Sequence, residues 1–360
     1  MALRVLHNVP LASRTSFGLG GQARNLVEIH DEPTLAEALH WAERHQQPVF
    51  VLGGGSNVVI ADEGWPGLVI HMKLRGIQTS LDAQGVQIRV AAGEPWDDLV
   101  AWTVAEGWAG LECLSGIPGS TGATPIQNVG AYGQEISEVI SAVHGWDRRT
   151  GQRCVISPDD CGFGYRHSRF KEDPQSMVIL GVEFMLRPGG LPTLRYAELR
   201  RCFSGQATPP LAEVRAQVLE LRRSKSMVIE PDDPNRRSAG SFFTNPVVET
   251  TQADAVVAQA VREGLAADAE AVPRYPTQDG RVKIPAAWLI EAAGFRKGQR
   301  DGPVGLSTRH ALAVVHHGGG TTAQLVAFAQ KIQRAVRERF GVELRPEPVF
   351  VGVGVGVGAE

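Results

Sequence analysis

The sequence has few cysteines, no long apolar run and no excess of charge of one sign. Its four cysteines are widely spaced and contain no CxxC pair, so neither a disulfide framework nor a cysteine zinc site is indicated; they are Cys113, Cys154, Cys161 and Cys202. Lysine and arginine total 36 against 39 aspartates and glutamates, a formal net charge of -3 that excludes a broad basic surface for nucleic acid. No run of ~18 apolar residues is present to span a bilayer, and the opening residues lack the apolar region of a signal peptide. We therefore expect a protein of the reducing cytoplasm that neither inserts in a membrane nor binds nucleic acid.

The composition is that of a globular protein with an unusual amount of glycine. Hydrophobic residues make up 43% and charged residues 21% of the 360 positions. The 41 glycines amount to about 11%, above the usual ~7% and without a collagen-like period, so glycine serves particular turns. At roughly 150 residues per domain, the length predicts two or three domains.

Helix and strand patterns alternate along the chain. Thr34 and Glu37 have the spacing of a capping box and predict a helix that ends near His45. Further strands are predicted at 48–52, 58–60, 86–92, 311–316 and 348–351, and further helices at 95–107, 211–223, 285–294 and 323–340. The Val-Gly repeat at 351–360 has little to bury against and is interpreted as a frayed tail without function.

Two glycine runs are candidate anion sites. In the run 53–57, consecutive glycines can aim backbone N–H groups at an anion, and Ser56 and Asn57 add donors. The run lacks the Gly-Lys-Ser/Thr ending of a P-loop, and a strand follows where a dinucleotide fingerprint needs a helix, so a plain glycine turn stays the alternative. The run 318–322 suggests a helix N-terminus with Thr322 as N-cap, but no lysine or arginine follows closely and a simple connection explains it.

Three further segments carry candidate chemistry. The stretch 112–135 is rich in Gly, Pro, Ser and Thr but poor in charge, which favours an ordered loop around a large flat ligand over a plain irregular loop. The segment 162–171 combines three bases with three aromatics and suits a carboxylate or phosphate beside a ring, unless it is a solvated basic loop. In 238–246 a serine stands between glycine and two phenylalanines, outside any hydrolase elbow, and is interpreted as a hydrogen-bond or proton donor. Scattered bases are candidates for a substrate diphosphate, although each alone is more often a surface residue: Arg222, Arg223, Lys225, Lys283 and Lys297.

Taken in order, these segments resemble the flavin-dependent UDP-N-acetylenolpyruvoylglucosamine reductases. The resemblance covers nearly the whole chain, in the blocks Thr15–Gly18, LGGGSN, IPGSTGATPIQNVGAYGQE, GYRHSRFK, AGSFFTNP, Trp288–Glu291 and Arg345–Phe350. One departure is the stretch MVIEPDDPNRRS between Lys225 and Ser241, which is longer than in enterobacterial members and weakens the assignment of Lys225. The Val-Gly tail also lies outside the family pattern.

The resemblance implies an α+β architecture, the three-domain vanillyl-alcohol-oxidase-type FAD-binding fold with a C-terminal substrate domain. Residues 1–73 and 74–224 would bind FAD, 225–350 would bind the substrate, and 351–360 would form the tail. The pyrophosphate would lie on Gly53, Gly54, Gly55, Ser56 and Asn57. The rest of the cofactor would be bound by the long loop, through Gly119, Ser120, Thr121, Gly122, Ile126, Gln127, Asn128, Gly130, Ala131 and Tyr132.

The same resemblance implies reduction of UDP-N-acetylglucosamine enolpyruvate to UDP-N-acetylmuramate in peptidoglycan precursor synthesis, with NADPH as reductant of the FAD. Ser241 would donate the proton, while Arg166 and Glu347 would stabilise the enolate. Substrate contacts would come from Tyr196, which marks the first type of the family, and from Lys225, Asn245 and Lys297. We expect a cytoplasmic monomer without a metal.

The sequence leaves three other functions open. A flavin oxidase of the same fold would act on a sugar or an alcohol, but Ser241, Arg166 and Glu347 together favour reduction of an alkene. A nucleotide-sugar binding protein without turnover would be expected to have lost Ser241 or Arg166. A nucleotide-dependent transferase would need a lysine after the glycine loop, and none is there.

Overall fold

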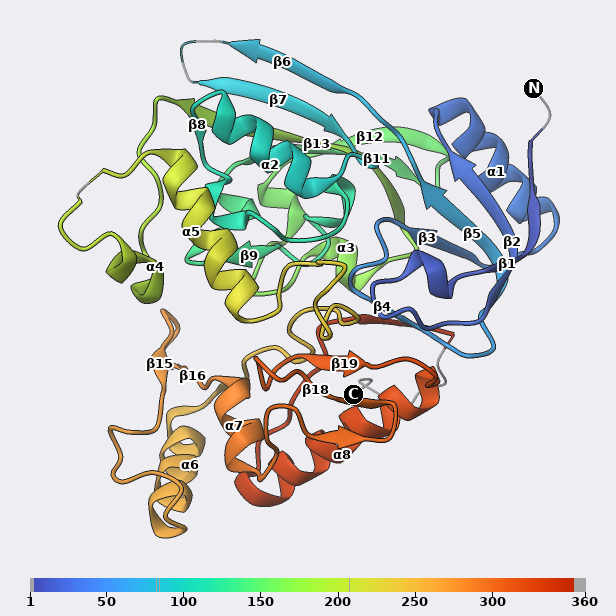
Figure 1. Ribbon diagram of the computed structural model, residues 1–360. Coiled ribbons are helices and arrows are strands. Elements are labelled where there is room, and N and C mark those ends of the chain that lie inside the picture. Colours follow the sequence, from blue (N-terminus) through green and yellow to red (C-terminus); the bar gives the residue numbers. More distant parts are fainter. Residues whose placement is uncertain (1–2, 82, 84, 207, 353–360) are drawn as a thin grey trace. The chain divides into compact units, whose positions relative to one another are not determined.

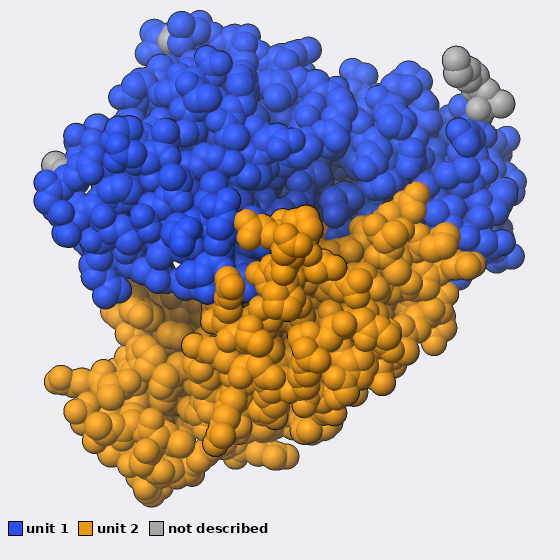
Figure 2. Space-filling model, viewed as in Figure 1, with its two compact units in different colours: residues 1–9, 23–55, 65–228 blue, residues 10–22, 56–64, 229–360 orange. Residues whose placement is uncertain are grey.

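The structure is a computed structural model that describes residues 3–81, 83, 85–206 and 208–352 (Figure 1). The chain forms two compact units, coloured separately in Figure 2. Unit 1 comprises Met1–Val9, Ala23–Gly55 and Trp65–Val228, and unit 2 comprises Pro10–Gln22, Ser56–Gly64 and Ile229–Glu360. Each unit thus collects separate stretches of sequence. The division of the sequence at residues 73 and 224 stays a prediction.

The first sheet of unit 1 is built around parallel strands. Its order is β1 (Leu6–Pro10), β2 (Gln22–Ile29), β5 (Trp65–Met72) and β3 (Val49–Leu52), and β5 runs parallel to both β2 and β3. Strands that run parallel in one sheet need a crossover connection, and helix α1 (Glu32–Arg44) supplies one between β2 and β3, which lie on either side of β5. The helix buries Leu35, Ala38 and Ala42, the apolar stripe that its sequence predicts.

Helix α1 begins earlier than its capping-box pattern predicts. The N-cap is Asp31, whose Oδ1 accepts a hydrogen bond from the Thr34 N–H at 2.7 Å. A proline in the first turn needs no partner for its missing N–H and presets the helical φ, so the helix starts before Thr34. The prediction that Thr34 caps this helix was therefore wrong, whereas its end at His45 is confirmed.

The second sheet of unit 1 is antiparallel. Its main order is β12 (Gln152–Ile156), β11 (Ile140–Asp147), β13 (Met177–Pro188), β7 (Val86–Ala91) and β6 (Ile77–Leu81), and β8 (Trp108–Ala109) pairs with the end of β13. The other elements of unit 1 are α2 (Trp96–Ala105), β9 (Gly130–Ala131), β10 (Gln134–Glu135), α3 (Arg169–Glu172), α4 (Ala197–Cys202) and α5 (Leu211–Ser224). One hydrophobic core joins both sheets with α1 and α2. The connections between these elements carry the candidate site residues of this unit.

Unit 2 packs short strands against one long helix. Its sheets are β17 (Arg300–Asp301), β18 (Val304–Leu306) and β19 (Val314–His316); β14 (Val247–Val248), β16 (Val282–Lys283) and β15 (Tyr275–Pro276); and the parallel pair β4 (Val58–Ile60) and β20 (Val349–Val351). Its helices are α6 (Thr250–Arg262), α7 (Ala286–Ala292) and α8 (Thr322–Phe340). Helix α8 buries Leu325, Phe328, Ile332 and Val336 at helical spacing in a core that includes Phe242 and Phe243. This core fixes the segment that carries Ser241.

A carboxylate of unit 2 occupies the start of α8. Thr321 is the N-cap, in a capping box with Gln324, so the prediction of Thr322 as N-cap was wrong. The N–H groups of Thr322 and Ala323 donate to the two oxygens of Asp62 at 2.7 and 2.9 Å. The charge that this helix terminus attracts is supplied by the protein itself. The glycine run before the helix is a connection, as its lack of nearby bases suggests.

The predicted strand at 311–316 is shorter in the structure. The Ser307 hydroxyl accepts hydrogen bonds from the N–H groups of Arg309 and His310, and the His310 ring accepts one from Leu312 N–H. These side-chain contacts hold a turn, so β19 begins only at Val314. Within the described part of the chain, no helix combines the length and the apolar character required to cross a membrane.

Candidate active site

Two glycine-containing loops of unit 1 pack directly on each other. A Cβ added to Gly53 would lie 2.5 Å from Ser120 Oγ, and one added to Gly54 would lie 2.7 Å from Gly119 Cα. Only glycine permits this approach, because any side chain would collide with the facing loop. The structure therefore brings together two segments that the sequence predicts to bind one diphosphate-containing cofactor.

The long loop is ordered by hydrogen bonds within unit 1. Thr121 donates its N–H to Glu94 O at 2.8 Å, and Gly122 donates its N–H to Ala92 O at 2.9 Å. These two predicted cofactor residues therefore direct their backbone donors into the protein and shape the loop. The prediction of an ordered loop is confirmed, since the stretch contains two short 3-10 turns and the β9–β10 hairpin.

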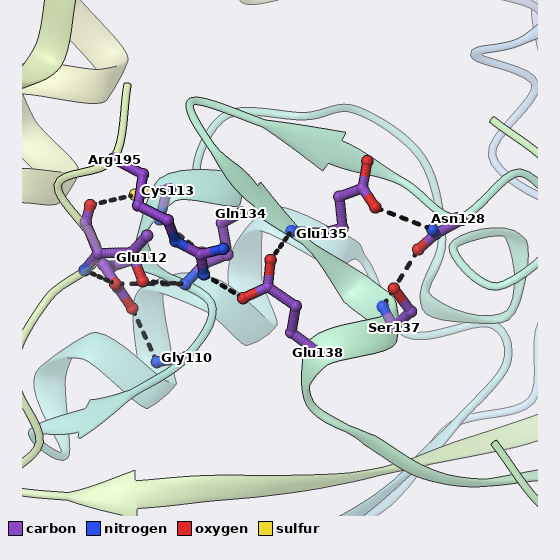
Figure 3. A network of polar contacts seen from close by, with 10 residues as sticks. Gly110, Glu112, Cys113, Asn128, Gln134, Glu135, Ser137, Glu138 and Arg195 are labelled. Atoms are coloured by element: carbon purple, nitrogen blue, oxygen red, sulfur yellow. Dashed lines mark hydrogen bonds and ion pairs between the residues drawn. The ribbon is translucent and has the colours of Figure 1, made fainter. Parts of the chain in front are cut away.

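Asn128 joins the long loop to the segment 162–171. Its buried side chain donates to Gly164 O at 3.0 Å. Within the loop the same side chain donates to Glu135 Oε2 at 3.2 Å, and its Oδ1 accepts from Ser137 N–H at 3.1 Å (Figure 3). The buried Ser168 hydroxyl donates to Ile126 O at 2.5 Å. The Asn128–Gly164 and Ser168–Ile126 hydrogen bonds therefore join the long loop to the segment 162–171.

Arg166 contacts the same loop with its guanidinium group. Its Nη2 donates to Gly130 O at 2.6 Å, and its guanidinium carbon lies 5.3 Å from the centre of the Tyr165 ring. The residue has a left-handed φ of 55°, which is uncommon for a residue with a side chain and marks a constrained position. The half-buried Arg166 is therefore part of the loop assembly, so the alternative of a solvated basic loop does not describe it.

Two predicted substrate residues meet at Tyr132. The Tyr196 ring packs edge-on against Tyr132 with centroids 5.3 Å apart, and Lys225 Nζ lies 5.8 Å from the Tyr132 centroid. Lys225 also forms an ion pair with Glu198 at 2.5 Å. Burial raises the pKa of Tyr132 to about 12, so its hydroxyl stays protonated at neutral pH. Tyr132 thus links the predicted cofactor loop to two predicted substrate residues.

In unit 2, Ser241 and Glu347 lie on adjoining backbone segments. Glu347 donates its N–H to Phe242 O at 2.9 Å, and Thr244 donates its N–H to Arg345 O at 3.0 Å. Both predicted catalytic side chains are half-buried, and Ser241 directly precedes the buried phenylalanines of the core. The structure therefore places this predicted proton donor beside one of its two predicted partners.

Of the remaining predicted residues of unit 2, Asn57 and Asn245 form hydrogen bonds with the backbone and Lys297 is exposed. Asn57 donates to Glu347 O at 3.3 Å, which ties the end of the first glycine run to the Glu347 segment. Asn245 Oδ1 accepts from Ala286 N–H at 2.9 Å and so holds the start of α7. Lys297 is exposed and lies 3.8 Å from the Glu291 carboxylate. These contacts do not bring Lys297 to Asn245, and the role of this lysine stays a prediction.

Two features of unit 1 escape the sequence analysis. Arg222 is not a plain surface base: Nη2 donates to Met227 O at 2.7 Å, Nε is buried, and burial lowers the pKa of the guanidinium group. Glu112 and Gln134 are almost fully buried, although they mark only the limits of the glycine-rich stretch in the sequence. A usable signal is the position of Glu112 directly after the small and apolar run from Trp108 to Leu111.

Comparison with known proteins identifies the family. Residues 232–351 match the model of the UDP-N-acetylenolpyruvoylglucosamine reductase C-terminal domain, and residues 23–154 match an FAD binding domain. UDP-N-acetylenolpyruvoylglucosamine reductases of Streptomyces coelicolor and Thermobifida fusca are each 47% identical, over 97% and 98% of this chain and 91% and 99% of theirs.

The crystal structure of the corresponding reductase from Thermus caldophilus superposes with a TM-score of 0.64 at 24% identity, covering 98% of this chain and 99% of that one. The expected α+β fold, with an FAD-binding part and a C-terminal domain, is confirmed by this likeness and by the matched models. Similarity of this extent to curated reductases, over nearly the full length, shows that the chain belongs to the UDP-N-acetylenolpyruvoylglucosamine reductases.

Proposed function

We propose that this protein uses FAD and NADPH to reduce UDP-N-acetylglucosamine enolpyruvate to UDP-N-acetylmuramate, a step of peptidoglycan precursor synthesis in the cytoplasm. The names of the similar reductases support the substrate. The observation that carries the proposal is the hydrogen bond from Arg166 to Gly130 O, because it joins a cation to the loop that the FAD-binding model covers. A cation beside a flavin suits a reaction in which the substrate becomes more negative.

The described residues fit FAD. Gly53, Gly54 and Gly119 present backbone without side chains where their two loops meet, which suits a diphosphate chain. We assign the pyrophosphate to the first glycine run and the ring system to the loop from Ile126 to Tyr132. Once bound and reduced by NADPH, FAD would supply the hydride that reduces the substrate alkene.

Reduction of the substrate alkene requires the chain to stabilise a negative charge and to donate a proton. When hydride adds to the methylene carbon, the electron pair of the double bond moves to the neighbouring carbon and its carboxylate, which forms an enolate. Arg166 stabilises this charge as a fixed cation, and Glu347 stabilises it by donating a hydrogen bond, for which its carboxyl group must carry a proton. Ser241 then delivers a proton to the carbon next to the carboxylate, which completes the addition of one hydride and one proton.

The uridine diphosphate part of the substrate calls for cations and hydrogen-bond donors. We assign Lys225, Lys297, Asn245 and Tyr196 to it. Lys225 has the best structural support of the four, because the contacts with Glu198 and the Tyr132 ring hold its ammonium group beside the cofactor loop. Tyr196 is 43% exposed and so retains surface for a ligand.

An anaerobic visible spectrum tests the proposal. The purified protein should be yellow, bleach when NADPH is added, and regain its colour when the enolpyruvyl sugar nucleotide follows. Bleaching without recovery would reject the substrate while retaining the flavin. A protein that stays colourless after incubation with FAD would reject the enzyme altogether. Parallel titration with NADH measures the preference between the two reductants.

A further inference from the structure

Glu112 is a buried carboxylate held by neutral donors. Its side chain is inaccessible to solvent, and Oε2 accepts from Gly110 N–H at 2.8 Å. Oε1 accepts from Thr193 N–H at 2.7 Å and from Gln134 Nε2 at 3.3 Å (Figure 3). A polar group that is buried without hydrogen-bond partners destabilises the folded state. These hydrogen bonds therefore satisfy the Glu112 carboxylate and also hold Gly110, Thr193 and Gln134 in place.

Gln134 and Cys113 bind the other polar groups of Thr193. Gln134 accepts from Cys113 N–H at 3.0 Å and donates to Thr193 Oγ1 at 3.2 Å. Cys113 Sγ donates to Thr193 O at 3.1 Å. The N–H, hydroxyl and carbonyl groups of Thr193 are thus all bound by buried residues. We call Glu112, Cys113 and Gln134 the Thr193 clamp.

Beyond Thr193, the chain stays close to the hairpin that carries Tyr132. Leu194 packs on a small core with Cys113, and Arg195 forms an ion pair with Glu138. A Cβ on Gly133 would lie 3.1 Å from Tyr196 N, so the two backbones almost touch. Tyr196 itself is largely exposed and meets Tyr132 at one ring edge. Its position therefore depends on the anchored residues before it.

We propose that the Thr193 clamp is a positioning device that sets Tyr196 against Tyr132, so that Glu112 and Gln134 govern substrate affinity without contacting the substrate. This inference rests on the proposed function, in which Tyr196 binds the sugar nucleotide. The clamp couples the hairpin that carries Tyr132 to the segment that carries Tyr196. Loss of the hydrogen bonds that reach Thr193 should free Tyr196 while leaving the cofactor loop in place.

The test uses two substitutions in the holoenzyme. Thr193→Val removes only the hydroxyl that Gln134 binds, and Gln134→Met removes all three hydrogen bonds of its amide at similar volume. The matched control is Thr103→Val, which removes a buried hydroxyl that donates to Val100 O within α2. Each variant is assayed for flavin absorbance, for the limiting rate of flavin reduction by NADPH, and for kcat and KM with the enolpyruvyl substrate.

We expect Thr193→Val to raise KM about fivefold to tenfold, the effect of one neutral hydrogen bond, with kcat within about twofold. Gln134→Met should raise KM by more than tenfold, while limiting flavin reduction in both variants stays within about twofold of wild type. Thr103→Val should change neither value.

Two results would overturn the clamp: an unchanged KM in Thr193→Val, or flavin reduction that falls as much as substrate affinity, as general damage would cause. If Gln134→Met does not fold, Thr193→Val decides alone. A wild-type protein that bleaches but does not react with the sugar nucleotide would instead reject the proposed function itself.

Discussion

Ser241 stands next to two fully buried phenylalanines and is held by core packing instead of a flexible loop. We expect Ser241→Ala to leave flavin reduction by NADPH nearly unchanged and to slow substrate reduction by about 10²–10⁴-fold, because only the second half-reaction requires a proton. Rapid-mixing measurements of the two half-reactions separate these effects. Equal losses in both would remove Ser241 from the proton-donor role.

Arg166 is expected to need the planar fork of its guanidinium group as well as its charge. Its two terminal nitrogens donate to Asn128 O and to Gly130 O, so the planar fork holds the guanidinium group in one orientation on the cofactor loop. Arg166→Lys keeps the charge but should lower kcat by about tenfold or more, since a lysine ammonium group lacks this fixed geometry. The control is Arg169→Lys, an exposed base three residues away. Normal turnover in Arg166→Lys would contradict the assignment.

At the level of elements, the start of α8 depends on a carboxylate from a distant part of the sequence. Asp62 accepts hydrogen bonds from the N–H groups of Thr322 and Ala323 and interacts favourably with the helix dipole. Asp62→Ala should lower the free energy of unfolding by about 1–2 kcal/mol. Equilibrium denaturant unfolding measures this, with Glu63→Ala as the exposed neighbour that should change it little. A similar value for both variants would show that the cap is unimportant.

The sequence predicts elements well where the signal is local. Helices α2, α5, α7 and α8 and strands β3, β4 and β7 begin and end within about two residues of their predicted limits. The N-cap residues of α1 and α8 were predicted wrongly, because Asp31 caps α1 in place of Thr34 and Thr321 caps α8 in place of Thr322. A contact between distant parts of the chain, such as that of Asp62 with α8, cannot be predicted from a local sequence pattern.

The same limit applies to the candidate site. Glycine and basic motifs are local, so the sequence predicts the loop and Arg166 that the structure joins. The Thr193 clamp and Thr193 itself come from three separated segments, each ordinary by itself. Their chemistry becomes visible only through burial and distance, which no single window of sequence contains.

For the whole molecule, buried thiols predict a loss of stability in alkali. Burial raises the pKa of Cys161 from its ordinary 9.0 to about 11, and burial also raises the pKa of Cys113. Above pH 9 the unfolded chain releases thiol protons that the folded chain retains, so their stabilising contribution is complete below that pH and is lost as the pH rises toward the folded pKa.

We therefore expect the free energy of unfolding of the wild type to fall between pH 8 and pH 10. In Cys161→Ala this fall should be smaller by roughly 1 kcal/mol. Denaturant titrations at the two pH values measure the difference. Cys202→Ala is the matched control, since this thiol is exposed and should leave the pH dependence unchanged. Identical pH dependence in all three proteins would contradict the prediction.

The parallel pair β4–β20 has a consequence for how the protein is made. It joins residues 58–60 to residues 349–351, so the ribosome must synthesise nearly all of the described chain before unit 2 can close. At about 5–20 residues per second, the early strand waits tens of seconds for its partner. During this interval β4 exposes an unpaired edge beside the apolar residues of its own core. A nascent chain of this protein is thus expected to depend on chaperones until β20 emerges from the ribosome.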